Sequence, residues 1–172
     1  YNLNAIIFQC RPASDALYES ALNPYSQYLS KNRIEDESKF DLLGYLTQEA
    51  KKENIEVHAW MNPYRVTNKD LEKLNMTKED YLNTLSDKNF AKIHPELVLT
   101  TKEHHLILDP ASKEVQDFLV QTVLEIANKY DIKAFHIDDY FYPYDPIVDE
   151  KEDEKRMRIA PYLPLADFRR YN

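Results

Sequence analysis

The sequence predicts an α/β fold built on a parallel sheet. Three short stretches, residues 4–10, 55–60 and 134–138, are rich in β-branched and aromatic residues, which favour strands. Helical patterns lie between them, and strands that alternate with helices are typical of parallel sheets and barrels. Each strand also ends in polar residues, and the carboxyl ends of parallel strands are where such folds place their sites. We therefore expect one site, shared by three strand ends.

The first half of the chain predicts a strand, a loop, a helix and a second strand. Residues 4–10 are the first strand, and residues 12–34 form a loop with proline and asparagine turn signals. Residues 41–53 predict a helix, because apolar residues recur at helical spacing and Asp41 can cap it. The second strand follows at residues 55–60.

A long connection, residues 61–103, follows the second strand. We expect short helices at residues 67–74 and 77–85, the second with a capping box formed by Thr77 and Asp80. Connections of this length in an α/β protein are usually functional. This long helical insertion is therefore expected to serve the site.

The second half predicts a short extra strand at residues 104–108 and then a helix at residues 112–130. Ser112 can cap this helix, and its apolar residues form one stripe. The third strand, residues 134–138, follows after a short turn. Residues 145–172 are expected to form a charged loop, with a further helix near the end of the chain.

Composition limits both the architecture and the partners. A length of 172 residues suits one domain with a real core. The net charge of −8 argues against a nucleic-acid partner, which would need a basic face. No run of about 18 apolar residues is present, so the sequence predicts no transmembrane segment.

Two residue types are scarce. The single cysteine, Cys10, cannot form an internal disulfide, and its apolar strand predicts a buried thiol. Gly44 is the only glycine. Loop positions that need a positive φ must therefore rely on asparagine or aspartate, which tolerate it best after glycine.

Each predicted strand has one face that carries polar groups, because side chains alternate along a strand. These faces hold Ile7, Gln9 and Arg11 in the first strand, His58, Trp60 and Asn62 in the second, and His136, Asp138 and Tyr140 in the third. A parallel sheet normally buries both of its faces in apolar side chains. The polar faces therefore predict the lining of a pocket, as at the mouth of a barrel.

The strongest sign of function is the adjacent pair Asp138 and Asp139 at the end of the third strand. Ionised carboxylates beside an apolar core are costly unless they are paired or used. The other polar residues also allow structural explanations. His58 and His136 would then be hydrogen-bonded core histidines, and Arg11 the salt-bridge partner of Asp138 or of another aspartate nearby.

Several motifs, in order and at similar spacing, resemble the glycosyl hydrolase-like 10 family over nearly the whole chain. They are Ile7-Phe8-Gln9, Arg11-Pro12-Ala13, Asp15-Ala16-Leu17-Tyr18, His58-Ala59-Trp60, Asn62-Pro63-Tyr64-Arg65, His94-Pro95-Glu96, Asp138-Asp139-Tyr140-Phe141-Tyr142-Pro143 and Asp167-Phe168-Arg169-Arg170-Tyr171-Asn172. This family is similar to (β/α)8-barrel glycoside hydrolases. The resemblance implies a TIM-barrel-type fold of which this chain covers about strands 2 to 4, with the long insertion between them. It also implies a single catalytic domain over residues 1–172 that is truncated at both ends.

The resemblance implies a function as well: hydrolysis of glycosidic bonds in a bacterial cell-wall or related polysaccharide by carboxylate acid/base catalysis. Family members are secreted or lipid-anchored, so we expect an extracellular or cell-envelope protein. Glycoside hydrolysis needs two carboxyl groups. Asp138 or Asp139 would supply one, and the other would be Asp109, Asp15 or an acid beyond Asn172.

We expect the remaining polar residues to bind the oligosaccharide, without a cofactor or a metal ion. These residues are Gln9, Arg11, Asp15, His58, Trp60, Asn62, Tyr64, Arg65, Asp109, His136, Tyr140 and Tyr142. Among them, Trp60, Tyr140 and Tyr142 would form an aromatic platform for sugar rings.

Two other functions are compatible with these residues. Ser14, Ala134 and Ala111 stand where the family usually has glycine, and Asp109 where it has asparagine; these departures favour a catalytically inactive glycan-binding protein on the same scaffold. The second alternative is a metal-dependent hydrolase or deacetylase. The histidines and aspartates at 58, 136, 138 and 139 are metal-ligand types, but the chain has no compact H-x-x-x-H motif.

Overall fold

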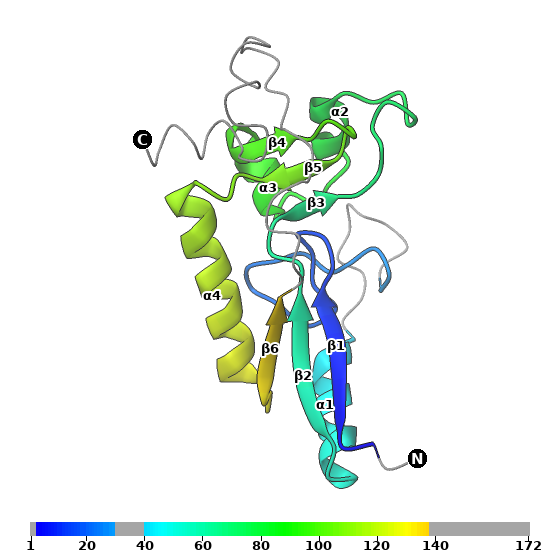
Figure 1. Cartoon of the computed structure of the whole chain (residues 1–172), viewed down its shortest axis with the longest axis vertical. Coiled ribbons are helices and arrows are strands. Elements are labelled where there is room, and N and C mark those ends of the chain that lie inside the picture. Colours follow the sequence, from blue (N-terminus) through cyan, green and yellow to red (C-terminus); the bar gives the residue numbers. More distant parts are fainter. Residues whose placement is uncertain (1–2, 30–39, 138–172) are drawn as a thin grey trace.

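The computed structural model describes residues 3–29 and 40–137, and a three-stranded parallel sheet forms its centre. Strands β1 (Ala5–Arg11), β2 (Glu56–Met61) and β6 (Ala134–Ile137) lie in the order β1-β2-β6 (Figure 1). Both strand pairs are parallel. The three predicted strands are thus confirmed, with small shifts at their ends.

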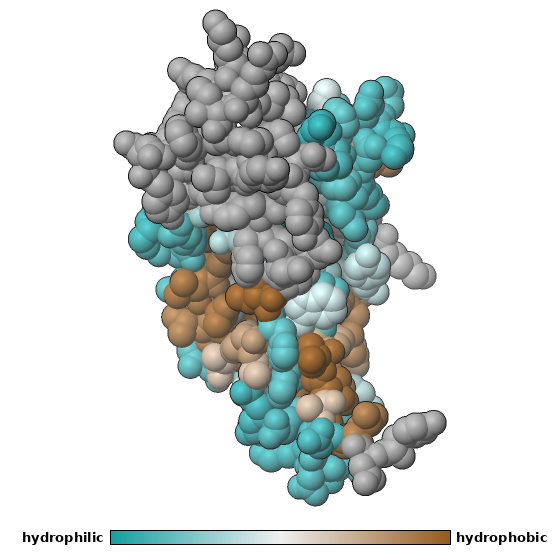
Figure 2. Space-filling view, in the orientation of Figure 1, coloured by the Kyte–Doolittle hydropathy of each residue, from teal (hydrophilic) through white to brown (hydrophobic). Residues whose placement is uncertain are grey.

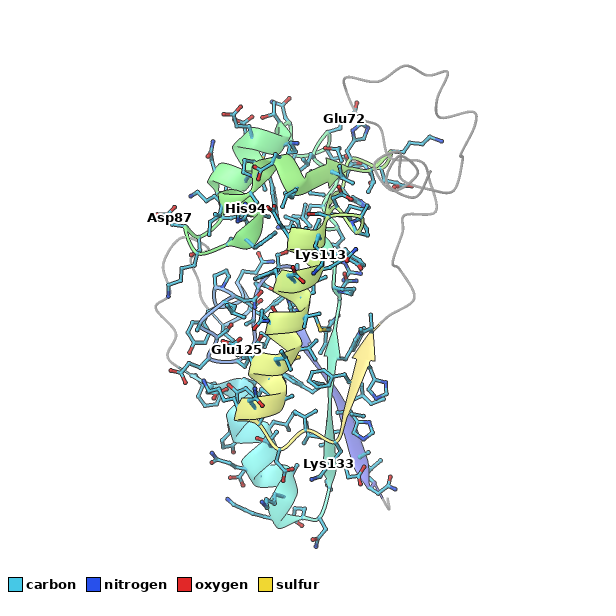
Figure 3. The ribbon with its side chains drawn as sticks, turned by 90° about the vertical axis from the view of Figure 1, so that its left-hand side faces the viewer. Glu72, Asp87, His94, Lys113, Glu125 and Lys133 are labelled. Atoms are coloured by element: carbon cyan, nitrogen blue, oxygen red, sulfur yellow. The ribbon has the colours of Figure 1, made fainter. Side chains whose placement is uncertain are left out.

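Two helices cover one face of this sheet. They are α1 (Leu42–Lys52) and α4 (Lys113–Lys129), and Figure 3 shows both on the same side of the strands. Asp41 caps α1 and Ser112 caps α4, each through a side-chain oxygen that accepts a backbone N–H, as predicted. The core beneath the helices consists of Cys10, Ala16, Tyr18, Leu43, Ala50, Val57, Ala59, Ile126 and Tyr130. No helix in the described ranges is long and apolar enough to cross a membrane.

The insertion forms a second layer beyond the carboxyl ends of the parallel strands (Figure 1). Its small antiparallel sheet, in the order β3-β5-β4, consists of β3 (Arg65–Thr67), β4 (Val98–Thr100) and β5 (Leu106–Leu108). Its helices are α2 (Lys78–Asn83), α3 (Phe90–Ile93) and the 3-10 turn η1 (Pro95–Leu97). The predicted extra strand is confirmed as β5, and the predicted capped helix is confirmed as α2, with both halves of its capping box present.

The predicted helix at residues 67–74 is wrong. Thr67 ends β3, and the chain then turns, because the Asp70 carboxylate accepts the N–H groups of the residues two and three positions later at 3.0 and 3.2 Å. The Leu71 N–H donates to the carbonyl of His104, at 3.1 Å, instead of to a local partner. Pairing with β5 has overridden local helical propensity, so the insertion is a mixed α/β layer and not a helical one.

A register shift at the end of β1 moves Arg11 off the face that it was expected to share with Gln9. Gln9 pairs with Trp60, but Arg11 pairs with Met61 on the far side of the irregularity. The Arg11 side chain is completely buried as a result. Cys10, inside the shift, is buried as predicted, and burial raises the pKa of its thiol to about 12.

Among the described residues, a positive φ occurs at Ser14, Asn54, Asn75 and His104, none of which is glycine. The two asparagines confirm the expectation that asparagine replaces glycine at positions with a positive φ. Ser14 and His104 also adopt this conformation, which was not predicted. The φ of 48° at Ser14 lies in the region that glycine adopts without steric cost, so serine is strained there.

Gly44 is required by close packing and not by its backbone conformation. A Cβ atom at Gly44 would lie 2.5 Å from Oδ2 of Asp41, the carboxylate that caps α1. This carboxylate is held in place, because it also accepts the Tyr130 hydroxyl at 2.9 Å. The cap therefore ties the start of α1 to the end of α4, and it leaves no room for a side chain at residue 44.

We expect Gly44→Ala to lower the free energy of unfolding by about 1 kcal/mol, the usual cost of a disturbed cap. At an open helix position the same change stabilises by about 1 kcal/mol. Urea denaturation of Gly44→Ala in the wild type and in an Asp41→Ala background measures both cases. The substitution should become stabilising once the carboxylate is gone, and stabilisation in the presence of Asp41 would contradict this account.

Candidate functional site

The face of the parallel sheet opposite α1 and α4 carries a pair of histidines. His58 Nδ1 lies 3.0 Å from His136 Nε2, and the two rings stack with their centres 5.1 Å apart. The second nitrogen of His58 lies 3.3 Å from the Glu56 carboxylate. Both histidines are half-buried, so they are hydrogen-bonded partners on an open sheet face and not core residues. Trp60, which pairs with His136 across the two strands, is also half-buried.

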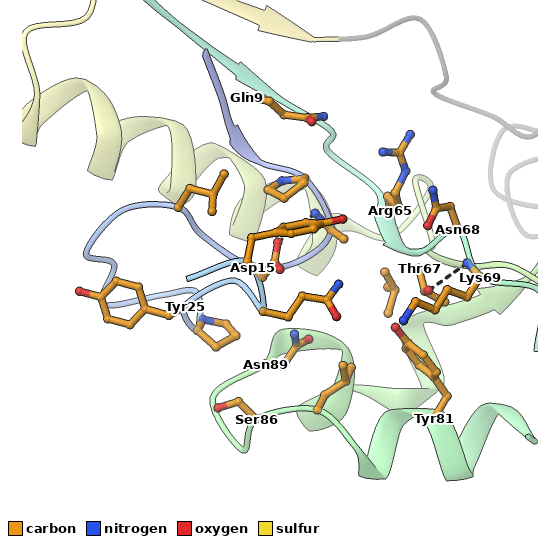
Figure 4. Close-up of a pocket in the computed structure, with 18 of the residues that line it drawn as sticks. Gln9, Asp15, Tyr25, Arg65, Thr67, Asn68, Lys69, Tyr81, Ser86 and Asn89 are labelled. Atoms are coloured by element: carbon orange, nitrogen blue, oxygen red, sulfur yellow. Dashed lines mark hydrogen bonds between the residues drawn. The ribbon is translucent and has the colours of Figure 1, made fainter. Parts of the chain in front are cut away.

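A cavity of about 590 Å³ opens at the carboxyl end of β1, between the loop that follows this strand and the insertion (Figure 4). Three residues that the sequence predicted for the site line it: Gln9 from β1, Asp15 from the loop and Arg65 from β3. Tyr25 and Tyr28 from the same loop and Lys69 from the insertion also line the cavity. At this edge of the sheet, the cavity is thus lined by segments that lie far apart in the sequence.

Arg11 is not part of this cavity lining, and its donors are used by the protein itself. Its Nη1 donates to the carbonyls of Asn62, at 2.7 Å, and Pro63, at 3.0 Å, while Nε donates to Oδ1 of Asn23 at 3.1 Å. Burial lowers the pKa of the Arg11 guanidinium, and the neighbouring Tyr18 and Asp15 oppose this shift. The structure thus makes Arg11 an internal anchor between the ends of β1 and β2. Its predicted role as a sugar ligand stays a prediction, and it would require a ligand to reach a fully buried side chain.

Asn62 and Asp109 are also buried and hold turns. The Asn62 side chain accepts the Arg65 N–H at 2.9 Å, and the Asp109 side chain accepts the Ala111 N–H at 2.9 Å just before α4. Neither residue lines the cavity. Asn62 therefore positions Arg65, and Asp109 is placed to shape the entry to α4 and not to meet a ligand in this cavity.

Tyr64 lies away from the cavity, in a shallow apolar groove between α4 and the end of β6. Val120, Leu124 and Ile137 expose about half of their surface along this groove, and Figure 2 shows apolar patches over this part of the molecule. Tyr64 also packs against the core of the insertion. The predicted contact of Tyr64 with a sugar would need a ligand that extends to this groove.

The predicted catalytic pair Asp138 and Asp139, together with Tyr140 and Tyr142, lies outside the described residues. They follow directly after Ile137, the last residue of β6. Because β6 runs parallel to β2, its carboxyl end lies at the same edge of the sheet as those of β1 and β2. Within residues 3–29 and 40–137, no cluster of three or more His, Cys, Asp or Glu side chains is arranged to hold a metal ion.

Several cavity residues were not predicted from the sequence. Tyr25 and Tyr28 come from the loop after β1, and Lys69, Tyr81 and Asn89 come from the insertion. The unusual length of the insertion was the one signal that pointed to this region. It could not identify residues, because the fold alone decides which side of the insertion faces β1.

A helix-covered parallel sheet, with a cavity at the carboxyl end of a strand, defines an α/β protein with its site at a sheet edge. The chain belongs to the glycosyl hydrolase-like 10 family, whose model matches residues 1–160. This confirms the family resemblance of the sequence motifs.

Similar proteins include Glycosyl hydrolase YngK of Bacillus subtilis (strain 168), 40% identical over 174 residues that cover 99% of this chain and 32% of that protein. Glycosyl hydrolase DigH of Escherichia coli (strain K12) is 30% identical over 173 residues, which cover 99% of this chain and 38% of that protein. The chain thus spans about a third of the length of these curated relatives. A hypothetical protein from Ruminiclostridium thermocellum ATCC 27405 has a similar crystal structure, with a TM-score of 0.51 and 14% identity, over 80% of this chain and 63% of that one. This last similarity concerns the fold alone.

We expect Arg11→Lys to lower the free energy of unfolding by about 3 kcal/mol, because it breaks a buried network of charged hydrogen bonds. Arg65→Gln is the matched control, since it removes a cation from the same region but leaves stability within about 0.5 kcal/mol. Chemical denaturation measures both. An Arg11→Lys protein of wild-type stability that no longer binds glycans would restore the ligand role.

Proposed function

We propose that this chain is part of a (β/α)8-barrel glycoside hydrolase, in which β1, β2 and β6 are about strands 2 to 4. The parallel strand order, the helices on one face and the polar groups on the other support this assignment. In a closed barrel the helix-covered face would lie outside, and the open face with His58 and His136 would line the interior. Residues 1–172 would then belong to a single domain.

The reaction that we propose is hydrolysis of O-glycosyl bonds by a pair of carboxyl groups. The cavity at the carboxyl end of β1 supports this proposal, because β6 ends at the same edge of the sheet and Asp138 and Asp139 follow it directly in the sequence. One of these two carboxyls would be a catalytic group. The second carboxyl group would come from Asp15 or from an acid outside this chain. Asp15 is the one carboxylate among the described cavity residues.

The substrate that we propose is a bacterial cell-wall or related polysaccharide, at an extracellular or cell-envelope location. Membership of a glycosyl hydrolase-like family supports a carbohydrate substrate. Gln9 and Arg65 would bind its polar groups, and the tyrosines of the cavity would contact its sugar rings. The histidine pair, Trp60, Tyr140 and Tyr142 would contribute to a longer binding surface on the open face of the sheet.

One observation favours a second function, a catalytically inactive glycan-binding protein. Hydrolysis needs two carboxyl groups, but the described part of the cavity presents only Asp15. A protein of this kind would keep the cavity and the sugar contacts without turnover.

We expect Asp138→Asn or Asp139→Asn to reduce hydrolysis by about 100-fold or more, the typical worth of a positioned acid or base. The assay is release of fragments from peptide-free peptidoglycan glycan strands and chitooligosaccharides by the full-length protein. Asp131→Asn is the control, because Asp131 precedes β6 at its amino end and pairs with lysines on the surface. Bound glycan without released fragments in the wild type would favour the inactive binding protein.

A further inference from the structure

Arg65 is a cation that lines the cavity, where no carboxylate among the described residues forms an ion pair with it. Its backbone N–H donates to the side chain of Asn62, and Arg11 binds the Asn62 carbonyl, so Arg65 stands on a buried hydrogen-bond network. Its side chain is half-buried, and Figure 4 shows it on the same side of the cavity as Gln9. Within the described ranges, the Arg65 guanidinium makes no ion pair with a carboxylate.

The charged groups on the described part of the cavity differ in sign from the excess charge of the chain. The whole sequence has 30 acidic and 22 basic residues, but the charged lining residues within the described ranges are Arg65, Lys69 and Asp15. The Asp15 side chain is buried and accepts the Ala13 N–H at 3.1 Å, and its negative charge opposes the lowering of the Arg11 pKa by burial. On the described part of the cavity surface, Arg65 is therefore a half-buried positive charge without a paired carboxylate.

The chemistry of a guanidinium narrows the ligand that fits this charge. Its planar fork of donors matches the two oxygens of a carboxylate, and such charged pairs are stronger than neutral hydrogen bonds. Tyr25 and Tyr28 line the same cavity, and Tyr28 exposes 75% of its surface. A cavity lined by an exposed aromatic ring and a guanidinium suits a sugar ring that bears an acidic group.

We propose that Arg65 binds the carboxylate of an acidic sugar unit, and that the cavity therefore selects glycans that carry carboxylate groups. This proposal rests on the proposed function, because it assumes that the cavity binds a glycan. It makes Arg65 a determinant of specificity and assigns it no part in breaking the glycosidic bond. The carboxylate would belong either to the sugar ring, as in a uronic acid, or to an acid attached through an ether, as in the glycan strands of peptidoglycan.

The test compares dissociation constants for the same glycans with their carboxylates free or capped as methyl amides. The probes are peptide-free peptidoglycan glycan strands and oligogalacturonides, with neutral chitooligosaccharides as the uncharged reference, and the protein is used at full length. We expect capping to weaken wild-type binding by about tenfold or more, the range for a hydrogen bond between charged groups. In Arg65→Gln, the free and capped forms should bind within about twofold of each other. The probe whose affinity falls more on capping shows whether the preferred carboxylate is on the sugar ring or on an ether-linked acid.

Two control variants separate a specific contact from general attraction. Lys73→Gln removes one positive charge from the insertion, but Lys73 is 83% exposed, pairs with Asp70 and is not a cavity residue. It should keep the wild-type preference for free carboxylates. Arg65→Lys keeps the charge but loses the two-pronged donor, so it should retain only part of the preference.

Equal binding of free and capped glycans by the wild type would overturn the proposal and leave the proposed function intact. A preference that persists unchanged in Arg65→Gln would overturn it as well. If no probe binds and none is cleaved, including the neutral chitooligosaccharides, the proposed function itself fails, and this proposal fails with it.

Discussion

The burial of the Arg11 guanidinium is the constraint on which the described site depends. A buried charge is costly unless all of its donors are satisfied, so the segments that satisfy them must come together around it. Those segments are the loop that contains Asn23 and the end of β2, with the Asn62 and Pro63 carbonyls. The result is a rigid corner at the carboxyl ends of β1 and β2. The cavity opens beside this corner, and Arg65 is positioned by it.

The loop after β1 is held from a second side by α4. Glu125 accepts the Ser20 hydroxyl and the Ala21 N–H, both at 2.6 Å, and Lys129 pairs with Glu19 at 2.6 Å. These contacts join segments more than one hundred positions apart in the sequence. A loop fixed both to the sheet and to a helix forms a pre-organised wall, which reduces the entropy that a ligand would have to remove on binding.

Within the described ranges, the polar residues predicted for the site thus lie in different environments. Arg11, Asn62 and Asp109 are buried away from the cavity, whereas Gln9, Arg65 and the buried Asp15 line it. The histidine pair and Trp60 lie on the open face of the sheet. In the proposed glycoside hydrolase this division would be functional, because groups that bind sugars would have to be accessible while the groups that position them stay fixed.

The sequence by itself determined the elements whose signals are local. Helical spacing and the caps at Asp41 and Ser112 identified α1 and α4, apolar runs identified the three parallel strands, and ordered motifs identified the family. A cap or a periodic stripe is made by neighbours in the chain, so it is visible without the fold.

Only the tertiary structure decided the rest. The shift between Gln9 and Arg11 depends on pairing with β2, and the strand at Arg65–Thr67 depends on pairing with β5. The cavity depends on a loop and an insertion that meet only after folding. Each of these outcomes is set by hydrogen bonds and charges between distant residues, and the energy of such contacts outweighs the local preferences that a sequence displays.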